Sequence, residues 1–177
     1  MNARKFLTAL LVAISLLTVS VAFAADDGNP QNSVAETDIA LSNQKVDEAD
    51  KLYDSGNYGD AVQSASEAIE LKPDYAAAYN NRGNSYNDLG QYERAIQDLD
   101  KAIELDPSYA AAYSNRGNSY NDLGQYERAI QDLDKAIELD PNLAVAHYNR
   151  GKCYEALGDT AKAQADFDKA KALGYSG

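Results

Sequence analysis

The sequence repeats itself with a period of 34 residues. Residues 75–107 and 109–141 are 33-residue segments that differ only at Asn80 against Ser114. A repeat of this length is one supersecondary unit, which buries its apolar face by stacking on its neighbours. The period divides the chain into four units, at residues 42–75, 76–109, 110–143 and 144–177. The same spacing relates Pro73, Pro107 and Pro141; Gly56, Gly90, Gly124 and Gly158; and Gly83, Gly117 and Gly151.

Each unit has the pattern of two helices joined by a tight turn. Tyr79, Gly83 and Tyr86 are spaced i, i+4, i+7 on one face of a first helix. This helix should end at Leu89-Gly90, because glycine accepts the left-handed conformation found after helices. The second helix places five apolar residues on one face, and the small residues among them allow a close approach. We expect the first helices of the second, third and fourth units to have their N-caps at Asp74, Ser108 and Asn142. The apolar residues of the second helix in the second unit are Ala95, Ile96, Leu99, Ala102 and Ile103.

The first 24 residues have the layout of a secretory signal peptide. Arg4 and Lys5 precede an uncharged stretch from Phe6 to Ala25, and Ala22-Phe23-Ala24 fits a cleavage site. We expect cleavage after Ala24, with residues 25–41 as a flexible leader. The protein would then be periplasmic or secreted, with no stable membrane insertion. An uncleaved signal that tethers the protein to the membrane is the alternative.

Composition excludes several classes of function. The formal net charge of -12 disfavours nucleic acid as a partner, because such binding depends on Lys and Arg. A single Cys and a single His leave no disulfide and no Cys/His metal site. Cys153 and His147 are six residues apart on one helix, so they do not form a nucleophile–base pair. The chain has no recognised catalytic motif. We therefore expect no enzyme activity, no metal and no cofactor.

The unit resembles the tetratricopeptide repeat. The pattern of that family appears as Tyr79-x2-Arg82-Gly83-x2-Tyr86, followed by Ala95-x3-Leu99 and by Pro107. Tyr stands in the place of the usual Trp, Leu in the place of Phe, and Arg82 in a place that is normally apolar. The resemblance covers residues 42–177. It implies an all-α fold, a right-handed α-solenoid of four helix-turn-helix units and eight helices.

Each arginine at the normally apolar place is followed 16 residues later by an aspartate on the paired helix. The first unit has Glu48 and Ser64 at these two places, so the Arg and the Asp are lost together. This covariation within the array predicts a structural ion pair in each unit, since a partly buried Arg needs a carboxylate. The alternative is that the arginines bind a carboxylate of a ligand. The expected pairs are Arg82 with Asp98, Arg116 with Asp132, and Arg150 with Asp166.

The first helices also carry a stripe of asparagines. In tetratricopeptide proteins the first helices line the concave groove, so the resemblance implies that much of this stripe faces inward. The asparagine amide both donates and accepts, which suits an extended peptide backbone. The alternative is that these residues only solvate a helix face. The candidate groove residues are Asn80, Asn81, Asn84, Asn87, Ser114, Asn115, Asn118, Asn121, Tyr148, Asn149 and Lys152.

Two specific modes of the family can be compared with this stripe. The resemblance extends to the repeats of O-linked N-acetylglucosamine transferases, whose asparagine ladder would correspond to Asn81, Asn115 and Asn149. The carboxylate clamp of chaperone-binding members instead needs lysines on successive first helices. The corresponding places hold Asn80, Ala77, Ala111 and Val145. We therefore expect no carboxylate clamp.

These observations predict an exported scaffold for protein–protein interaction. It would bind an extended peptide or protein segment in a concave, Asn-lined groove. Because the chain is acidic, the expected partner is a neutral to basic protein or peptide. The alternative is a structural spacer, or a self-associating component of a cell-envelope assembly without a peptide ligand.

Overall fold

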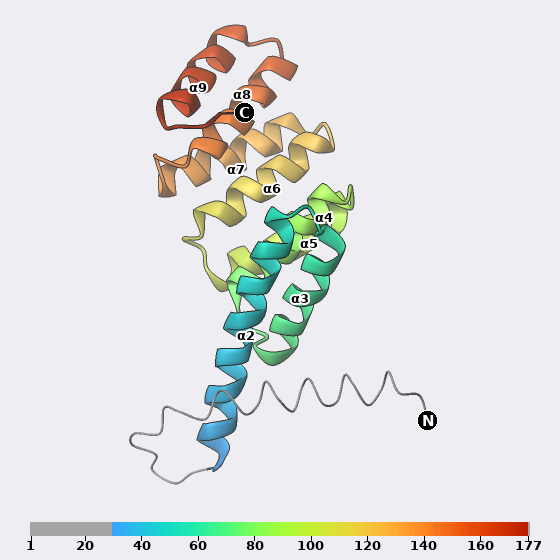
Figure 1. The fold of residues 1–177 in the computed structure, drawn as a ribbon. Coiled ribbons are helices and arrows are strands. Elements are labelled where there is room, and N and C mark those ends of the chain that lie inside the picture. The colour runs from blue at the N-terminus through green and yellow to red at the C-terminus, as the bar shows by residue number, and fades with distance from the viewer. Residues whose placement is uncertain (1–29, 177) are drawn as a thin grey trace. The chain divides into compact units, whose positions relative to one another are not determined.

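The computed structural model describes the backbone of residues 30–176, and side chains from residue 35 onward. The described part consists of helices joined by short turns, in four consecutive pairs (Figure 1). The first helices of the four pairs are α2 (Pro30–Asp54), α4 (Ala76–Asp88), α6 (Ala110–Asp122) and α8 (Ala144–Ala156). The second helices are α3 (Tyr58–Leu71), α5 (Tyr92–Leu105), α7 (Tyr126–Leu139) and α9 (Thr160–Ala172).

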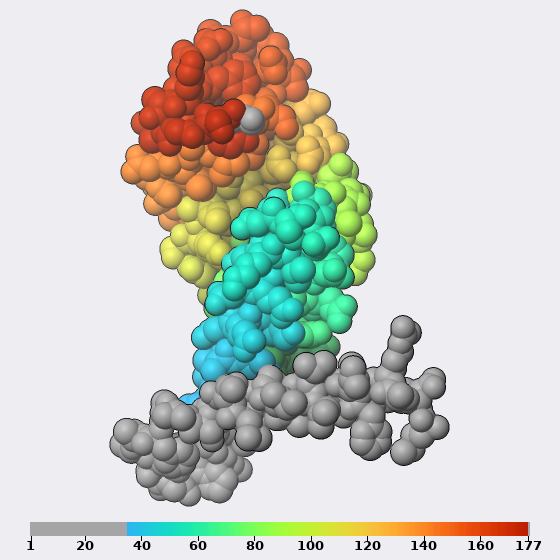
Figure 2. Space-filling view, in the orientation of Figure 1, coloured from blue at the N-terminus to red at the C-terminus, as the bar shows by residue number. Residues whose placement is uncertain are grey.

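The expected all-α solenoid of four units is confirmed. Residues from Thr37 onward form one compact unit, in which successive parts of the chain follow one another along the array (Figure 2). The first helix α6 contacts both α4 and α8, whereas α5, α7 and α9 make no such contacts among themselves. The first helices are therefore closer together than the second helices. This difference curves the array and places the first helices on its inner side.

The N-terminal part differs from the expected flexible leader. Helix α2 begins at Pro30, so residues 30–41 are helical in the structure. Proline is favoured in the first turn of a helix, because its missing N–H would have no partner there. The expected signal peptide, residues 1–24, lies outside the described residues. Within the described part, no helix is both long enough and apolar enough to cross a membrane.

The expected N-caps are displaced by one residue. The structure has Tyr75, Tyr109 and Leu143 in that position, and none of them makes a side-chain capping bond. At two of these turns an aspartate three residues before the N-cap holds the turn instead: the backbone N–H of Ser108 donates to Asp106 and that of Asn142 donates to Asp140, each at 2.9 Å. Such an Asx turn uses one further residue before the helix can begin.

In the second, third and fourth units the two helices meet at a glycine, whereas the first unit has Ala49 at this place. A Cβ atom at Gly117 would lie 2.8 Å from Leu133 Cγ and 3.1 Å from the carbonyl oxygen of Ala129. Gly83 has the same surroundings, and at Gly151 the neighbour is the ring of Phe167. Leu133 and Ala129 are fully buried. In these three units the first helix can therefore approach the second helix this closely only without a side chain at this position.

The substitution Gly117→Ala tests this contact. We expect it to lower the free energy of unfolding by about 1–3 kcal/mol, because the added methyl group overpacks a close helix contact. Gly59→Ala is the matched control, since Gly59 also lies in a helix and a Cβ there would meet nothing within 4 Å. That change should stabilise the protein by about 0.5–1 kcal/mol. Equal effects of both substitutions in urea unfolding would contradict the packing account.

Candidate binding face on the first helices

The candidate groove residues divide into a buried and an exposed group. Asn80, Asn87, Ser114 and Asn149 are each at most 8% exposed. Such side chains pack between helices and offer little surface to a ligand. These four were among the expected groove residues, and they are buried because the first helices contact their neighbours.

Hydrogen bonds of the stripe connect neighbouring first helices. Asn115 donates to Asn80 Oδ1 at 2.9 Å, and Asn87 donates to Asp122 Oδ2 at 3.0 Å. Asn81 donates to Asp50 Oδ1 at 2.6 Å in the same way. Much of the asparagine stripe is therefore structural, and its hydrogen bonds fix the spacing of the first helices.

The other polar side chains of the inner side remain partly exposed. Asn84 and Asn118 occupy the same position in consecutive units, and Lys152 occupies it in the last unit. Asn121 is also partly exposed, and its Oδ1 accepts from the thiol of Cys153 at 3.4 Å. Asn84 and Asn118 thus form a short column of amides on adjacent helices that an extended ligand could reach.

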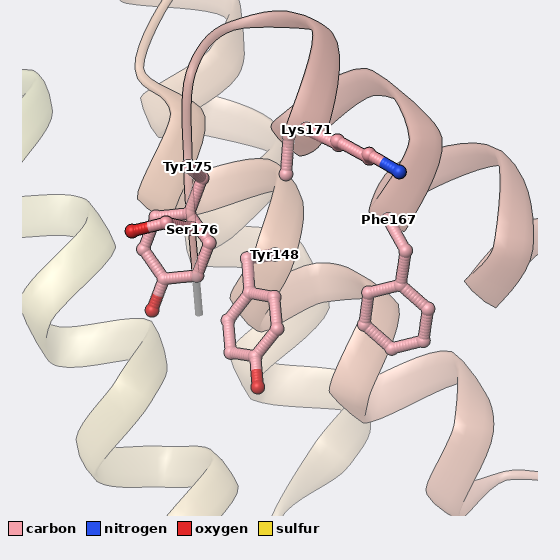
Figure 3. Close-up of a pocket in the computed structure, with 6 residues that line it drawn as sticks. Tyr148, Phe167, Lys171, Tyr175 and Ser176 are labelled. Atoms are coloured by element: carbon pink, nitrogen blue, oxygen red, sulfur yellow. The ribbon is translucent and has the colours of Figure 1, made fainter.

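Tyr148 lies at the C-terminal end of the array rather than in this column. Its ring centroid is 4.5 Å from that of Tyr175 and 5.6 Å from that of Phe167. These three rings border a hollow of about 290 Å³, together with Lys171 (Figure 3). Tyr148 therefore packs with the last turn of the chain, which covers part of the final unit.

The structure brings the three expected Arg and Asp residues together. The guanidinium of Arg116 donates from Nε to Asp132 Oδ2 and from Nη2 to Asp132 Oδ1, both at 2.7 Å. Arg82 and Asp98 make the same two-bond contact, as do Arg150 and Asp166. The hydrogen bond to Asp98 is the main cause that raises the pKa of Arg82. These arginines are held by the protein's own carboxylates.

Each of these arginines also contacts the preceding unit, a contact that the sequence pattern was not used to predict. Arg116 Nη1 donates to Asp100 at 2.6 Å, and Arg150 Nη1 donates to Asp134 at 2.6 Å. Ser66 stands at the equivalent place before Arg82, and Arg82 Nη1 donates to Ser66 Oγ at 3.1 Å. The sequence contained a signal for this contact, because each of these polar partners lies 16 residues before its Arg. The arginines therefore join both helices of one unit and also two successive units.

His147 and Cys153 are parts of the packing. The ring of His147 is buried, with Nε2 3.2 Å from the carbonyl oxygen of Pro141. Tyr79 makes the corresponding contact in the second unit, from its hydroxyl to the carbonyl oxygen of Pro73 at 3.2 Å. Cys153 is fully buried and belongs to the core around Leu133.

Models of the tetratricopeptide repeat match the sequence over most of its length. The model described as "TPR repeat" matches residues 49–90, 83–122 and 117–158, and the model described as "Tetratricopeptide repeat" matches residues 144–174. The chain belongs to the tetratricopeptide repeat family. Comparison with curated proteins found no match.

Solved structures of tetratricopeptide repeat proteins are similar to this one. The first TPR of Spaghetti (RPAP3), bound to the HSP90 peptide SRMEEVD, is 27% identical with a TM-score of 0.63, over 68% of this chain and 95% of that chain. MamA is 27% identical with a TM-score of 0.64, over 80% and 83%. The second TPR domain of human RPAP3, in complex with the HSP70 peptide SGPTIEEVD, is 26% identical with a TM-score of 0.60, over 67% and 97%.

The ion pairs give a testable stability difference. Asp98→Ala leaves the guanidinium of Arg82 half-buried without its two acceptors, so we expect a loss of about 1–3 kcal/mol in the free energy of unfolding. Glu104→Ala is the control on the same helix, because the pair of Glu104 with Lys101 lies in solvent and should contribute far less. If urea unfolding of the two variants gives equal losses, the Arg–Asp contact is not stabilising.

The single thiol gives a second test. Burial raises the pKa of Cys153 to about 11, and only the thiolate reacts with alkylating agents. At pH 8 we expect iodoacetamide to modify the folded protein at least about 100-fold more slowly than the unfolded protein. The fold favours the neutral thiol, so its contribution to stability is complete below the unfolded pKa of about 8.5 and falls as the pH rises toward 11. Equal rates at pH 8 would show that the thiol is accessible.

Proposed function

We propose that this tetratricopeptide repeat protein is an exported scaffold that binds an extended peptide or protein segment along its inner side. The observation that carries the proposal is the column of Asn84 and Asn118 on adjacent first helices, in which both amides remain partly exposed. An amide that donates and accepts can pair with a peptide backbone in place of a neighbouring strand. Export rests on the signal-like sequence of residues 1–24.

The surroundings of this column support a backbone ligand. The bonded amides of Asn80, Asn87 and Asn115 hold the first helices at a fixed spacing, so the exposed amides are preorganised. A rigid surface loses little conformational entropy when it binds, which favours affinity. The ladder compared above with the glycosyltransferase repeats is reduced here, because Asn81 is bonded to Asp50 and Asn149 is buried.

The ligands of the similar structures support a peptide in general rather than the same peptide. The peptides bound by the RPAP3 domains, SRMEEVD and SGPTIEEVD, end in acidic residues. The inner side of the present array has aspartates at Asp50, Asp88 and Asp122, and a like charge across an interface is unfavourable. We therefore propose a neutral to basic ligand.

A displayed library of random peptides tests this function directly. We expect the purified protein to enrich a set of peptides, and a variant with Asn84→Ala and Asn118→Ala to lose them. The matched control carries Gln97→Ala and Gln131→Ala, which remove two exposed carboxamides from the second helices of the same units. Circular dichroism would verify that all three proteins keep their helices.

The control variant should bind the enriched peptides as the unchanged protein does. If both variants bind equally well, the inner side is not the binding face. If no peptide is enriched and the mass measured by light scattering rises with protein concentration, the protein is instead a self-associating component, as the alternative hypothesis holds.

A further inference from the structure

An aspartate ends three consecutive first helices. Asp54, Asp88 and Asp122 are each the last residue of their helix, they are 34 residues apart, and all three are exposed. The turns that follow α4 and α6 lie on the same side of the array (Figure 1). The three carboxylates, which we call the aspartate column, therefore follow one edge of the inner side. Ala156 takes this position in the fourth unit, so the column ends there.

This is an unfavourable place for a negative charge. The C-terminus of a helix carries the negative end of the helix dipole and its unpaired carbonyl groups, so cations are stabilising there and anions are not. Helices α4 and α6 have no basic residue in the last turn to compensate. Among the described residues, no Lys or Arg forms an ion pair with Asp54, Asp88 or Asp122.

The carboxylates elsewhere in the array are treated differently. Five aspartates of the second helices are neutralised by arginines of the first helices. Two members of the aspartate column instead accept hydrogen bonds from neutral groups: Tyr53 donates to Asp88, and the amides of Asn87, Asn118 and Asn121 donate to Asp122. These bonds orient the carboxylates without cancelling their charge. The five paired aspartates are Asp98, Asp100, Asp132, Asp134 and Asp166.

A second observation at the same place points to a ligand. The side chain of Asn87 is 6% exposed, and its Nδ2 donates to Asp122, so the amide lies against that carboxylate. The Oδ1 atom of the same amide is buried and has no hydrogen-bond partner. An unpaired buried acceptor is costly, and this one belongs to the amide that lies against Asp122. Nearby, burial raises the pKa of Asp50, and the charges of Asp47 and Asp54 raise it further, as expected where negative charge accumulates.

We infer that the aspartate column binds the Lys or Arg side chains of the ligand, and that it selects basic segments with cations spaced three residues apart. The inference rests on the proposed function, which supplies the backbone contacts at Asn84 and Asn118. These amides lie one helical turn before Asp88 and Asp122, on the same face. One ligand can therefore contact both sets of residues.

The spacing follows from the geometry of the array. Helices in contact are about 8–10 Å apart, so successive carboxylates of the column are separated by roughly this distance. A polyproline II segment repeats its orientation every three residues, over about 9 Å. Lysines at i, i+3 and i+6 of such a segment would face Asp54, Asp88 and Asp122 in turn. In a fully extended strand, residues three apart point to opposite sides and match the column less well.

Three synthetic peptides of equal length test the inference, each with a fluorescent label at one end. One has lysine at every third position among Pro and Ala, the second has the same composition with the lysines adjacent, and the third has Ala in place of lysine. We expect the purified protein to bind the spaced lysine peptide more tightly than the other two. Its affinity should fall with added salt, because exposed charge pairs are screened.

The variant with Asp54→Asn, Asp88→Asn and Asp122→Asn keeps acceptor oxygens for Tyr53 and Asn87 but removes three charges. We expect it to bind the spaced lysine peptide about tenfold more weakly, and to be at least as resistant to thermal unfolding because the charges oppose the helix dipoles. The control variant, Asp60→Asn with Glu93→Gln and Glu127→Gln, makes the same change in net charge on the second helices. It should keep the affinity within about twofold.

The outcomes separate this inference from the function it rests on. Equal binding of the spaced lysine peptide by the unchanged protein and the Asp→Asn variant overturns the inference, and so does an equal loss in the control variant. If the alanine peptide binds as well as the spaced lysine peptide and only the asparagine variant loses it, the backbone scaffold stands and the charge selection is wrong. If none of the three peptides binds, while library selection yields others that require Asn84 and Asn118, the charge selection is again wrong.

Discussion

The close contact between the two helices of a unit is the constraint on which the other features depend. It requires a glycine at residues 83, 117 and 151, because the neighbouring residue of the second helix fills the space that a Cβ would take. The second helices are thereby drawn against the first helices, and the arginine next to each glycine lies within reach of an aspartate. Stacking of these pairs then brings the first helices into contact with one another. The inner side, with its amides and carboxylates, is a product of that stacking.

Much of the fold could be predicted from the sequence because the period is exact. The repeated glycines, prolines and apolar residues fix the number of helices and their pairing, and the joint loss of Arg and Asp in the first unit indicates their contact. The roles of the asparagines could not be read in this way. The pattern places Asn80 and Asn84 on one face of the same helix. In the structure, however, Asn80 is buried against the next unit and Asn84 is not. That distinction depends on the curvature of the array. The start of α2 at Pro30 was also missed, since its first turns have no repeat counterpart.

The charges of the array are divided between two tasks. On the second helices, five aspartates pair with arginines that hold one unit to the next, so much of the charge on that side of the array stabilises the stacking. On the ends of the first helices, aspartates are oriented by neutral donors and keep their charge. Net charge alone does not describe this division. A sequence with the same composition, but with lysines in the last turns of α4 and α6, would have the same fold and a very different surface.

The near-identity of the second and third units also bears on how the chain reaches its native register. Because residues 75–107 and 109–141 differ at one position, α4 could dock on α7 almost as well as on α5, and two chains could exchange units through the same surfaces. Local contacts form first because they close short loops, which favours the correct neighbour during synthesis. The first unit helps to resolve the ambiguity afterwards, because it offers Ser66 to the arginine of the next unit where the second unit offers Asp100. Units at the ends of the array that differ in sequence thus help to fix the register of the two nearly identical units between them.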